Sequence, residues 1–325
     1  MKKVIFALAA VVALAACSKE QTVVADRGDA IGFDSFIENA SRAAADDFTS
    51  VDSLKVWGDV TGNIDDSSDD YIFLYNGADV TKGDKAYGEA WTCGQTEYWL
   101  PSATYNFMAI AGISGETTVT PASGAFPTKI TYEANGLTDL LLSEKVTVTT
   151  DNKSIPTGVN TNKCVAFTFK HLLAKVYFNF VNNSTSDNYK FEISNITISG
   201  AKASGEYSIT DKKWKSVSDD AVVTPFSFGS VANTITKGAS DPSPSAKACL
   251  FIPGAQTLIV SFKQMTYSGD KLMGEDTITA PLSTSFDANG CYIIKVSLSA
   301  GMPISFTVEQ DGLSGWDNKT DISIP

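Results

Sequence analysis

The chain contains a single histidine, His171, among its 325 residues. Nucleophilic catalysis by serine or cysteine usually needs a histidine base, so the sequence has room for one such site at most. His171 stands in an apolar run between Phe169 and Leu172, where a packed, hydrogen-bonded structural histidine is the commoner case. No glycine-rich phosphate loop, HExxH or P-loop sequence occurs. The sequence therefore predicts no catalytic residue and no enzyme.

Acidic residues exceed basic ones, 37 to 25, and give a net charge of −12. Without a basic stripe that could neutralise phosphates, we expect no nucleic-acid partner. The acidic segment Asp65–Asp70 offers oxygen ligands for Ca²⁺, but it lacks the alternating spacing and central glycine of an EF-hand loop, so a solvated loop is favoured. Pairs of carboxylates that could hydrolyse glycosides occur in any chain this acidic, and nothing selects one pair. We expect neither a metal nor a cofactor.

The thiol of Cys17 is the group with the most specific predicted chemistry. It follows Leu14-Ala15-Ala16, and the resulting Leu-Ala-Ala-Cys sequence is similar to the lipobox, whose cysteine receives a diacylglyceryl group. A basic start and the apolar run Val4–Ala16 precede it, and this run is too short to span a bilayer. We expect residues 1–16 to be a signal peptide and several acyl chains, palmitate among them, to anchor Cys17 in the outer membrane. The alternative is an ordinary secretory signal with a coincidental cysteine.

Four further cysteines, Cys93, Cys164, Cys249 and Cys291, allow three disulfide pairings, and the sequence does not choose among them. Three of the four lead into apolar runs, which favours buried thiols that pack as small hydrophobic groups. No CxxC spacing supports a metal site.

Beyond the signal peptide, the sequence has the pattern of β-strands. Short runs rich in Val, Ile, Thr, Phe and Tyr alternate apolar and polar residues between clusters of Gly, Asn, Asp and Ser. The clearest runs are Tyr71–Tyr75, Tyr105–Ile110, Lys145–Thr149, Val165–Phe169, Lys175–Val181, Phe191–Ile198, Thr257–Phe262, Tyr292–Leu298 and Ile304–Val308. Their number and spacing predict an all-β fold of sandwiches with Greek-key connections rather than a barrel.

The length favours two domains. The clearest seam is the polar segment Asp151–Lys163, which contains Pro156 and Gly158. The expected organisation is a signal peptide (1–16), a lipidated segment with the first strand (17–42), an N-terminal β-sandwich (43–157), a C-terminal β-sandwich (158–302) and a tail (303–325).

Two segments near the ends of the sequence share an apolar stripe. The stripes consist of Ile31, Phe33 and Ile37 near the start, and of Ile304, Phe306, Val308, Ile322 and Ile324 near the end. An open sheet edge presents unpaired backbone groups that an added strand can satisfy. One strand could therefore replace the other in a shared groove. The alternative is that Ile304–Val308 is the last strand of its own domain.

A predicted processing site lies between the first strand and the rest of the chain. The segment Asn39–Asp47 consists of small and polar residues around Arg42, a composition typical of an exposed, cleavable loop. Cleavage between Arg42 and Ala43 would free the first strand together with Cys17, whereas cleavage at Arg27 would leave that strand attached. The alternative is that Arg42 is only a solvated charge.

Several separate stretches carry a resemblance to a known family. They are Ser41-Arg42-Ala43, Tyr98–Pro101 with Tyr105–Ala109, Phe167–Val176, Ile196–Gly200, Gly290–Val296, and Ile304–Val308 with Trp316. In their order and spacing they resemble the fimbrillins, the subunits of protease-assembled (type V) pili. The resemblance implies two tandem transthyretin-like β-sandwich domains and assembly by donor-strand exchange.

The resemblance also implies a function. The chain would be a structural subunit of a cell-surface fimbria, exported as an outer-membrane lipoprotein, cleaved after Arg42 and polymerised to support adhesion. Its partners would be other fimbrillin subunits, an arginine-specific protease and, before processing, membrane lipid through Cys17. The sequence does not choose between a shaft, anchor or tip subunit. The alternative is a glycan-binding surface lipoprotein that does not polymerise, which would show a row of exposed aromatic residues, with Trp91, Trp99 and Trp214 as candidates.

Overall fold

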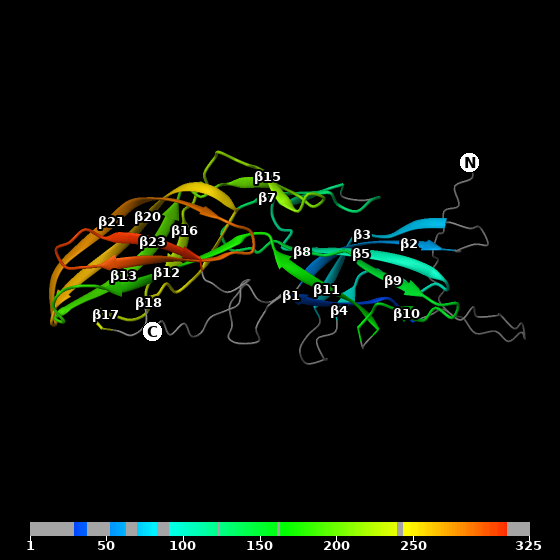
Figure 1. Cartoon of the computed structure of the whole chain (residues 1–325), viewed down its shortest axis with the longest axis horizontal. Coiled ribbons are helices and arrows are strands. Elements are labelled where there is room, and N and C mark those ends of the chain that lie inside the picture. The colour runs from blue at the N-terminus through cyan, green and yellow to red at the C-terminus, as the bar shows by residue number, and fades with distance from the viewer. Residues whose placement is uncertain are drawn as a thin grey trace, which may run out of the picture.

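The computed structural model describes residues 29–37, 53–62, 70–82, 91–121, 124–160, 163–238 and 243–310. Regular structure in these ranges consists of β-strands without a helix, which confirms the all-β prediction. Accordingly, the described ranges contain no helix that could cross a membrane. The molecule is elongated, with sheets gathered toward each end and a smaller sheet between them (Figure 1).

The first sheet has nine strands and is built mainly from the first half of the chain. Its main path runs β1-β11-β8-β5-β2-β3-β4, with β9 beside β5 and β10 beside β9. The strands are β1 (Gly32–Ile37), β2 (Ser53–Gly62), β3 (Asp70–Lys82), β4 (Trp91–Cys93), β5 (Ala103–Ala111), β8 (Leu141–Ser143), β9 (Val146–Thr150), β10 (Pro156–Thr157) and β11 (Cys164–His171). β1 pairs with β11 in parallel, and the other pairs are antiparallel.

Two further sheets pack face to face at the other end of the molecule. One has the order β18-β12-β22-β23 with β19 beside β12, and the other β16-β13-β20-β21 with β17 beside β13. Their strands are β12 (Ala174–Asn182), β13 (Tyr189–Ser199), β16 (Phe226–Gly229), β17 (Ile235–Thr236), β18 (Ser243–Pro244), β19 (Cys249–Phe251), β20 (Gly254–Ser268), β21 (Lys271–Phe286), β22 (Cys291–Leu298) and β23 (Ser305–Gln310). Aromatic pairs join the two sheets: the ring centroids of Phe178 and Phe228 lie 4.8 Å apart, and those of Phe180 and Phe262 5.3 Å.

A small fourth sheet links the two ends. It has the order β15-β14-β7-β6, from strands β6 (Thr118–Thr120), β7 (Lys129–Glu133), β14 (Ser204–Ser208) and β15 (Lys213–Val217). β7 and β14 pair along five residues, from Glu133 opposite Ser204 to Lys129 opposite Ser208. We call the two sheets that pack face to face the second body. A buried cluster beneath the small sheet contains Trp57 of the first sheet and Leu250 of the second body. Backbone pairing and side-chain packing therefore both cross between the halves of the chain.

The predicted seam Asp151–Lys163 does not separate the sheets. β10 lies within it and β11 follows it, yet both belong to the first sheet. The first sheet thus continues to His171, beyond the boundary expected after Thr157. The polar composition of the seam reflects a connection exposed to solvent, and such a connection can join two strands of one sheet. The division into two transthyretin-like domains with Greek-key connections stays a prediction.

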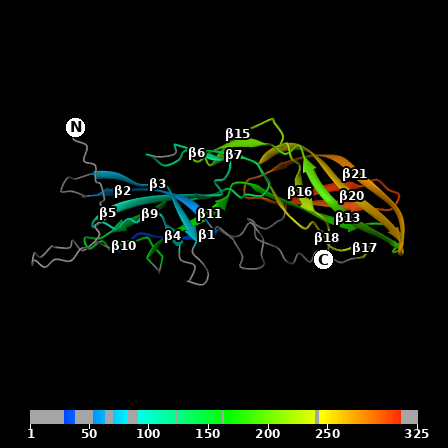
Figure 2. The same ribbon diagram turned by 180° about the vertical axis from the view of Figure 1, so that it is seen from behind.

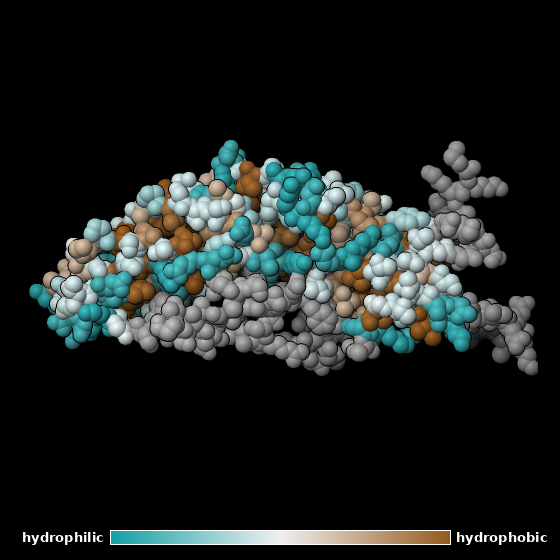
Figure 3. Space-filling view, in the orientation of Figure 1, coloured by the Kyte–Doolittle hydropathy of each residue, from teal (hydrophilic) through white to brown (hydrophobic). Residues whose placement is uncertain are grey.

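The strand predictions themselves agree with the structure. Each of the nine predicted runs overlaps an observed strand, from Tyr71–Tyr75 in β3 to Ile304–Val308 in β23. Apolar residues reach the surface only in separate patches on the face shown in Figure 3. In β11, for example, buried residues alternate with more exposed ones, so one face of the strand packs into the core.

Candidate functional site

The candidate site is the place where β1 completes the first sheet. On one side, β1 pairs with β11 over six residues, from Gly32 opposite Cys164 to Ile37 opposite Phe169. On the other side, the backbone N–H of Ile31 donates to the carbonyl of Glu97 at 2.8 Å. Figures 1 and 2 both show β1 beside β11 and β4. The strand is therefore bound at two edges by segments far from it in the sequence.

A second backbone bond secures the start of β1. The N–H of Trp99 donates to the carbonyl of Asp29 at 3.1 Å, and Ala30 pairs with Tyr98 as an antiparallel bridge. Nearby, an exposed ion pair joins Lys163 to Asp29 at 2.7 Å. Without β1, the outer edge of β11 and the backbone of Glu97–Trp99 would lose these partners, so the strand satisfies two open edges at once.

Phe33 is the central side chain of the groove that β1 fills. Its ring is 4% exposed and lies 5.3 Å from Tyr75, 5.9 Å from Phe107 and 5.8 Å from Phe167, measured between ring centroids. Ile31, two residues before it, is 6% exposed. This confirms that Ile31 and Phe33 share a buried face, as strand alternation predicts.

The floor of the groove is aromatic and buried. Trp99 packs edge-on against Tyr105 at 4.9 Å, and both side chains are buried. The Tyr105 hydroxyl accepts a hydrogen bond of 2.6 Å from the backbone N–H of Leu100. Burial raises the pKa of Tyr105 to about 12 and that of Tyr75 further. A strand that occupies this groove therefore needs an apolar face.

The fit is close where β1 begins. A Cβ atom placed on Gly32 would lie 2.8 Å from the Sγ atom of Cys164, closer than ordinary van der Waals contact. Glycine at this position lets β1 approach β11, and a larger residue would displace one of the two strands.

The predicted donor segment lies in β23, at the edge of a sheet in the second body. β23 pairs antiparallel with β22, with Phe306 opposite Val296 and Val308 opposite Ile294. Ile304, Phe306 and Val308 are partly buried and pack against the core of this body. An ion pair between Lys295 and Glu309 adds to the contact. In the structure of the single chain, β23 is thus the last described strand of its own sheet, in agreement with the alternative that the sequence offers.

Several predicted site residues lie outside the described residues. They are Cys17, Arg42, Ala43, Ile322 and Ile324, together with the acidic residues 65–69. Their roles in lipidation, processing and strand donation stay predictions. The side chain of Ile37 is likewise outside the description, although its backbone belongs to β1.

His171 has the structural setting expected from the sequence. Its side chain is buried, and Nδ1 lies 2.5 Å from Oδ2 of Asp139. Burial raises the pKa of the Asp139 carboxyl, although His171 opposes this shift. In the described ranges, no cluster of His, Cys, Asp and Glu has the composition of a metal site.

The cysteines and tryptophans also have packing roles. No disulfide joins Cys93, Cys164, Cys249 and Cys291. Trp99 is buried, whereas Trp91 and Trp214 are partly buried, and Trp214 donates from Nε1 to the Leu172 carbonyl at 2.9 Å. The large exposed aromatic residues in the described ranges are Tyr71 and Tyr98, so this part of the chain shows no row of aromatic side chains for stacking on sugars.

The sequence identified the strand but not the walls of its groove. Tyr75, Phe107 and Phe167 come from three strands, and strand alternation reveals buried faces but not which faces meet. The Tyr98–Pro101 stretch pairs with the start of β1. From the sequence, its resemblance to the fimbrillins and the candidate stacking residue Trp99 single it out, but neither predicts this pairing. The aromatic alternation of Phe167 and Phe169 was the signal available for β11.

Fold and site together define an all-β protein of several packed sheets, in which an N-terminal strand fills an apolar groove between distant segments. The family model described as fimbrillin-like matches residues 41–310. The chain belongs to the fimbrillin-like family. The match begins after β1 and ends with β23. Membership of this family implies a cell-surface location and association with other fimbrial subunits.

Two solved structures share the fold of this chain. A fimbrial protein from Bacteroides vulgatus is 13% identical with a TM-score of 0.56, and the alignment covers 88% of this chain and 99% of that one. A putative cell adhesion protein from Bacteroides ovatus is 15% identical with a TM-score of 0.51, covering 90% of this chain and 99% of that one. At these identities the likeness concerns the fold alone. No curated protein sequence matches the chain significantly.

Proposed function

We propose that the chain is a structural subunit of a cell-surface fimbria that supports adhesion. In this proposal it is exported as an outer-membrane lipoprotein acylated on Cys17, cleaved between Arg42 and Ala43 by an arginine-specific protease, and polymerised by donor-strand exchange. The observation that carries the proposal is the position of β1. This strand precedes the cleavage site in the sequence, yet it fills a groove whose walls all follow that site.

The distribution of arginine supports specific processing. The chain has two arginines, Arg27 and Arg42, and they flank β1 on its two sides. The remaining 325 − 42 = 283 residues contain none, although the chain has 25 − 2 = 23 lysines. An arginine-specific protease could therefore cut near β1 without any cleavage site in the rest of the subunit.

The chemistry of the tail supports its role as donor. In the apolar stripe of Ile304–Val308, Phe306 has Ile304 on one side and Val308 on the other. Whichever way the tail enters the groove, Phe306 can take the place of Phe33 with an aliphatic residue next to it. The same segment occupies a sheet edge in its own chain and is only partly buried, which lowers the cost of its release. Such an added strand contributes backbone hydrogen bonds and apolar contacts together.

Cleavage would also separate the subunit from its anchor. Cys17 and β1 both belong to the 42 residues removed, so one cut ends membrane attachment and opens the groove. A subunit with an empty groove exposes apolar side chains and unpaired backbone groups, which favours rapid filling by a neighbouring tail.

The test compares four chains in cells that assemble fimbriae: wild type, Arg42→Ala, Arg27→Ala and a deletion of Pro303–Pro325. SDS-resistant ladders from unheated surface extracts report polymerisation, and N-terminal sequencing reports processing. We expect ladders from wild type and from Arg27→Ala, the matched control. The Arg42→Ala chain should stay a lipid-bound monomer, and the deleted chain should be cleaved without forming ladders. Ladders from both Arg42→Ala and the deletion would exclude donor-strand exchange of this form.

A further inference from the structure

A cleft of about 550 Å³ lies where the first sheet, the small sheet and the second body meet. It is distinct from the groove of β1. Its floor is apolar and its rim is polar, and the volume is within the range of ligand sites in proteins. The floor contains Met108, Phe126, Leu142, Leu172 and Ile209, and the rim contains Glu144, Lys145, Lys170 and Lys212.

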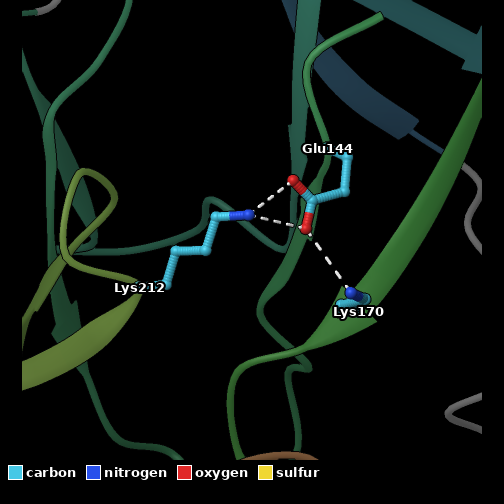
Figure 4. A network of polar contacts seen from close by, with 3 residues as sticks. All are labelled: Glu144, Lys170 and Lys212. Atoms are coloured by element: carbon cyan, nitrogen blue, oxygen red, sulfur yellow. Dashed lines mark hydrogen bonds and ion pairs between the residues drawn. The ribbon is translucent and has the colours of Figure 1, made fainter.

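The rim has more positive than negative charge. Glu144 accepts from Lys212 at 2.8 Å and from Lys170 at 3.4 Å, and Figure 4 shows the two ammonium groups converging on this one carboxylate. The Nζ atom of Lys145 lies 4.2 Å from the ring centroid of Phe126 and has no carboxylate partner within the described ranges. Three lysines against one glutamate favour an occupant that combines apolar and acidic side chains.

The end of the described chain lies close to this cleft. Gln310, the last residue of β23, is opposite Tyr292 in β22, and the cleft wall includes Ala288 and Asn289, just before β22. Because β23 runs antiparallel to β22, the chain leaves its last strand at the cleft end of the second body. The 15 residues that follow could reach roughly 50 Å when extended.

The composition of that segment matches the cleft. Residues 311–325 contain Leu313, Trp316, Ile322 and Ile324, with three aspartates against one lysine, Lys319. Their side chains thus offer both the apolar groups that the floor can bury and the negative charge that the rim favours.

We propose that residues 311–325 bind in the cleft of their own chain, with Trp316 on the apolar floor and acidic side chains beside Lys145. The bound segment holds the tail against its own subunit and contacts all three parts of the molecule that line the cleft. This contact does not require donor-strand exchange. If exchange occurs, the tail leaves the cleft before it is donated, so the cleft sets how readily a subunit polymerises.

Fluorine NMR of the intact chain containing 5-fluorotryptophan tests the contact, with the Trp316 signal assigned through Trp316→Phe. Four of the five tryptophans lie in described strands and loops, so Trp316 alone reports on the tail. We expect its signal away from the position of free 5-fluorotryptophan. Lys145→Glu should move it most of the way to that position, because a glutamate would repel the acidic segment. The exposed Lys153→Glu is the matched control and should leave it unchanged.

Three results would overturn the proposal: a Trp316 signal at the free position in the wild-type chain, no movement in Lys145→Glu, or a signal that depends on protein concentration. The last would show that the tail of another molecule occupies the cleft. Because the measurement uses unprocessed monomer, its outcome is independent of the ladders that test polymerisation.

Discussion

At the scale of single residues, the fit of β1 depends on Phe33. Its ring meets three others, from β3, β5 and β11, within 6 Å between centroids. A strand held by backbone bonds alone would bind to many edges, whereas a ring that fills one aromatic pocket selects one position along the groove. We therefore expect Phe33 to set the register of β1 in the groove.

Truncation of this ring gives the first prediction. Phe33→Ala should lower the free energy of unfolding of the unprocessed chain by about 3–5 kcal/mol, because it removes a buried ring and leaves a cavity. Urea denaturation measures the loss. Tyr71→Ala, at a side chain 56% exposed, is the control and should change stability by less than about 0.5 kcal/mol. Equal effects of the two substitutions would contradict the assigned role of Phe33.

The buried phenol of Tyr105 predicts a dependence on alkaline pH. Its pKa is raised by burial to about 12 in the folded chain, compared with about 10 in an unfolded one. The unfolded state therefore loses its proton first, and stability falls as the pH rises from about 10 through 12, by on the order of 2 kcal/mol. Urea midpoints measured across this interval should fall less steeply for Tyr105→Phe. An identical slope in the variant would assign the alkaline loss to other groups.

At the scale of elements, β23 has two possible roles that one pair of variants separates. Phe306→Asp places a charge on the inner stripe of the strand, whereas Thr307→Asp places it on the neighbouring exposed position. We expect Phe306→Asp to abolish ladders while it lowers monomer stability by only about 1–2 kcal/mol, since the side chain is partly buried. Thr307→Asp should leave ladders intact. Unfolding of the Phe306→Asp monomer would instead favour β23 as an indispensable strand of its own sheet.

The sequence predicted strands more successfully than it predicted their partners. Alternation places Phe167 and Phe169 on one face of β11, but it does not say that β11 pairs with β1 or that β1 runs parallel to it. The polar run before β11 has the composition of a domain boundary, yet it joins two strands of the first sheet. Composition reports exposure to solvent and not backbone pairing. Ile31 and Phe33 were found correctly, whereas Tyr75 and Phe107 depend on long-range contacts that no local pattern encodes.

At the scale of the whole molecule, the halves are joined more closely than two independent domains. A protease site inserted after Gly158 should allow a clean cut without separation of the two fragments. β11, on the far side of the cut, remains hydrogen-bonded to β8 in the first sheet, and β14 remains paired with β7. Size-exclusion chromatography under native conditions measures the association, with the uncut chain as the reference. Elution as two separate fragments would show that the shared sheets contribute little.

The ladder between β7 and β14 has a mechanical consequence. In Figure 1 the small sheet lies along the long axis of the molecule, between the first sheet and the two packed sheets at the other end. Hydrogen bonds of such a ladder stand perpendicular to the strands, so a pull along this axis loads the pairs from Glu133–Ser204 to Lys129–Ser208 in shear, together rather than one after another. The paired strands β7 and β14 would then resist extension at this junction, so under tension we expect other parts of the molecule to unfold first.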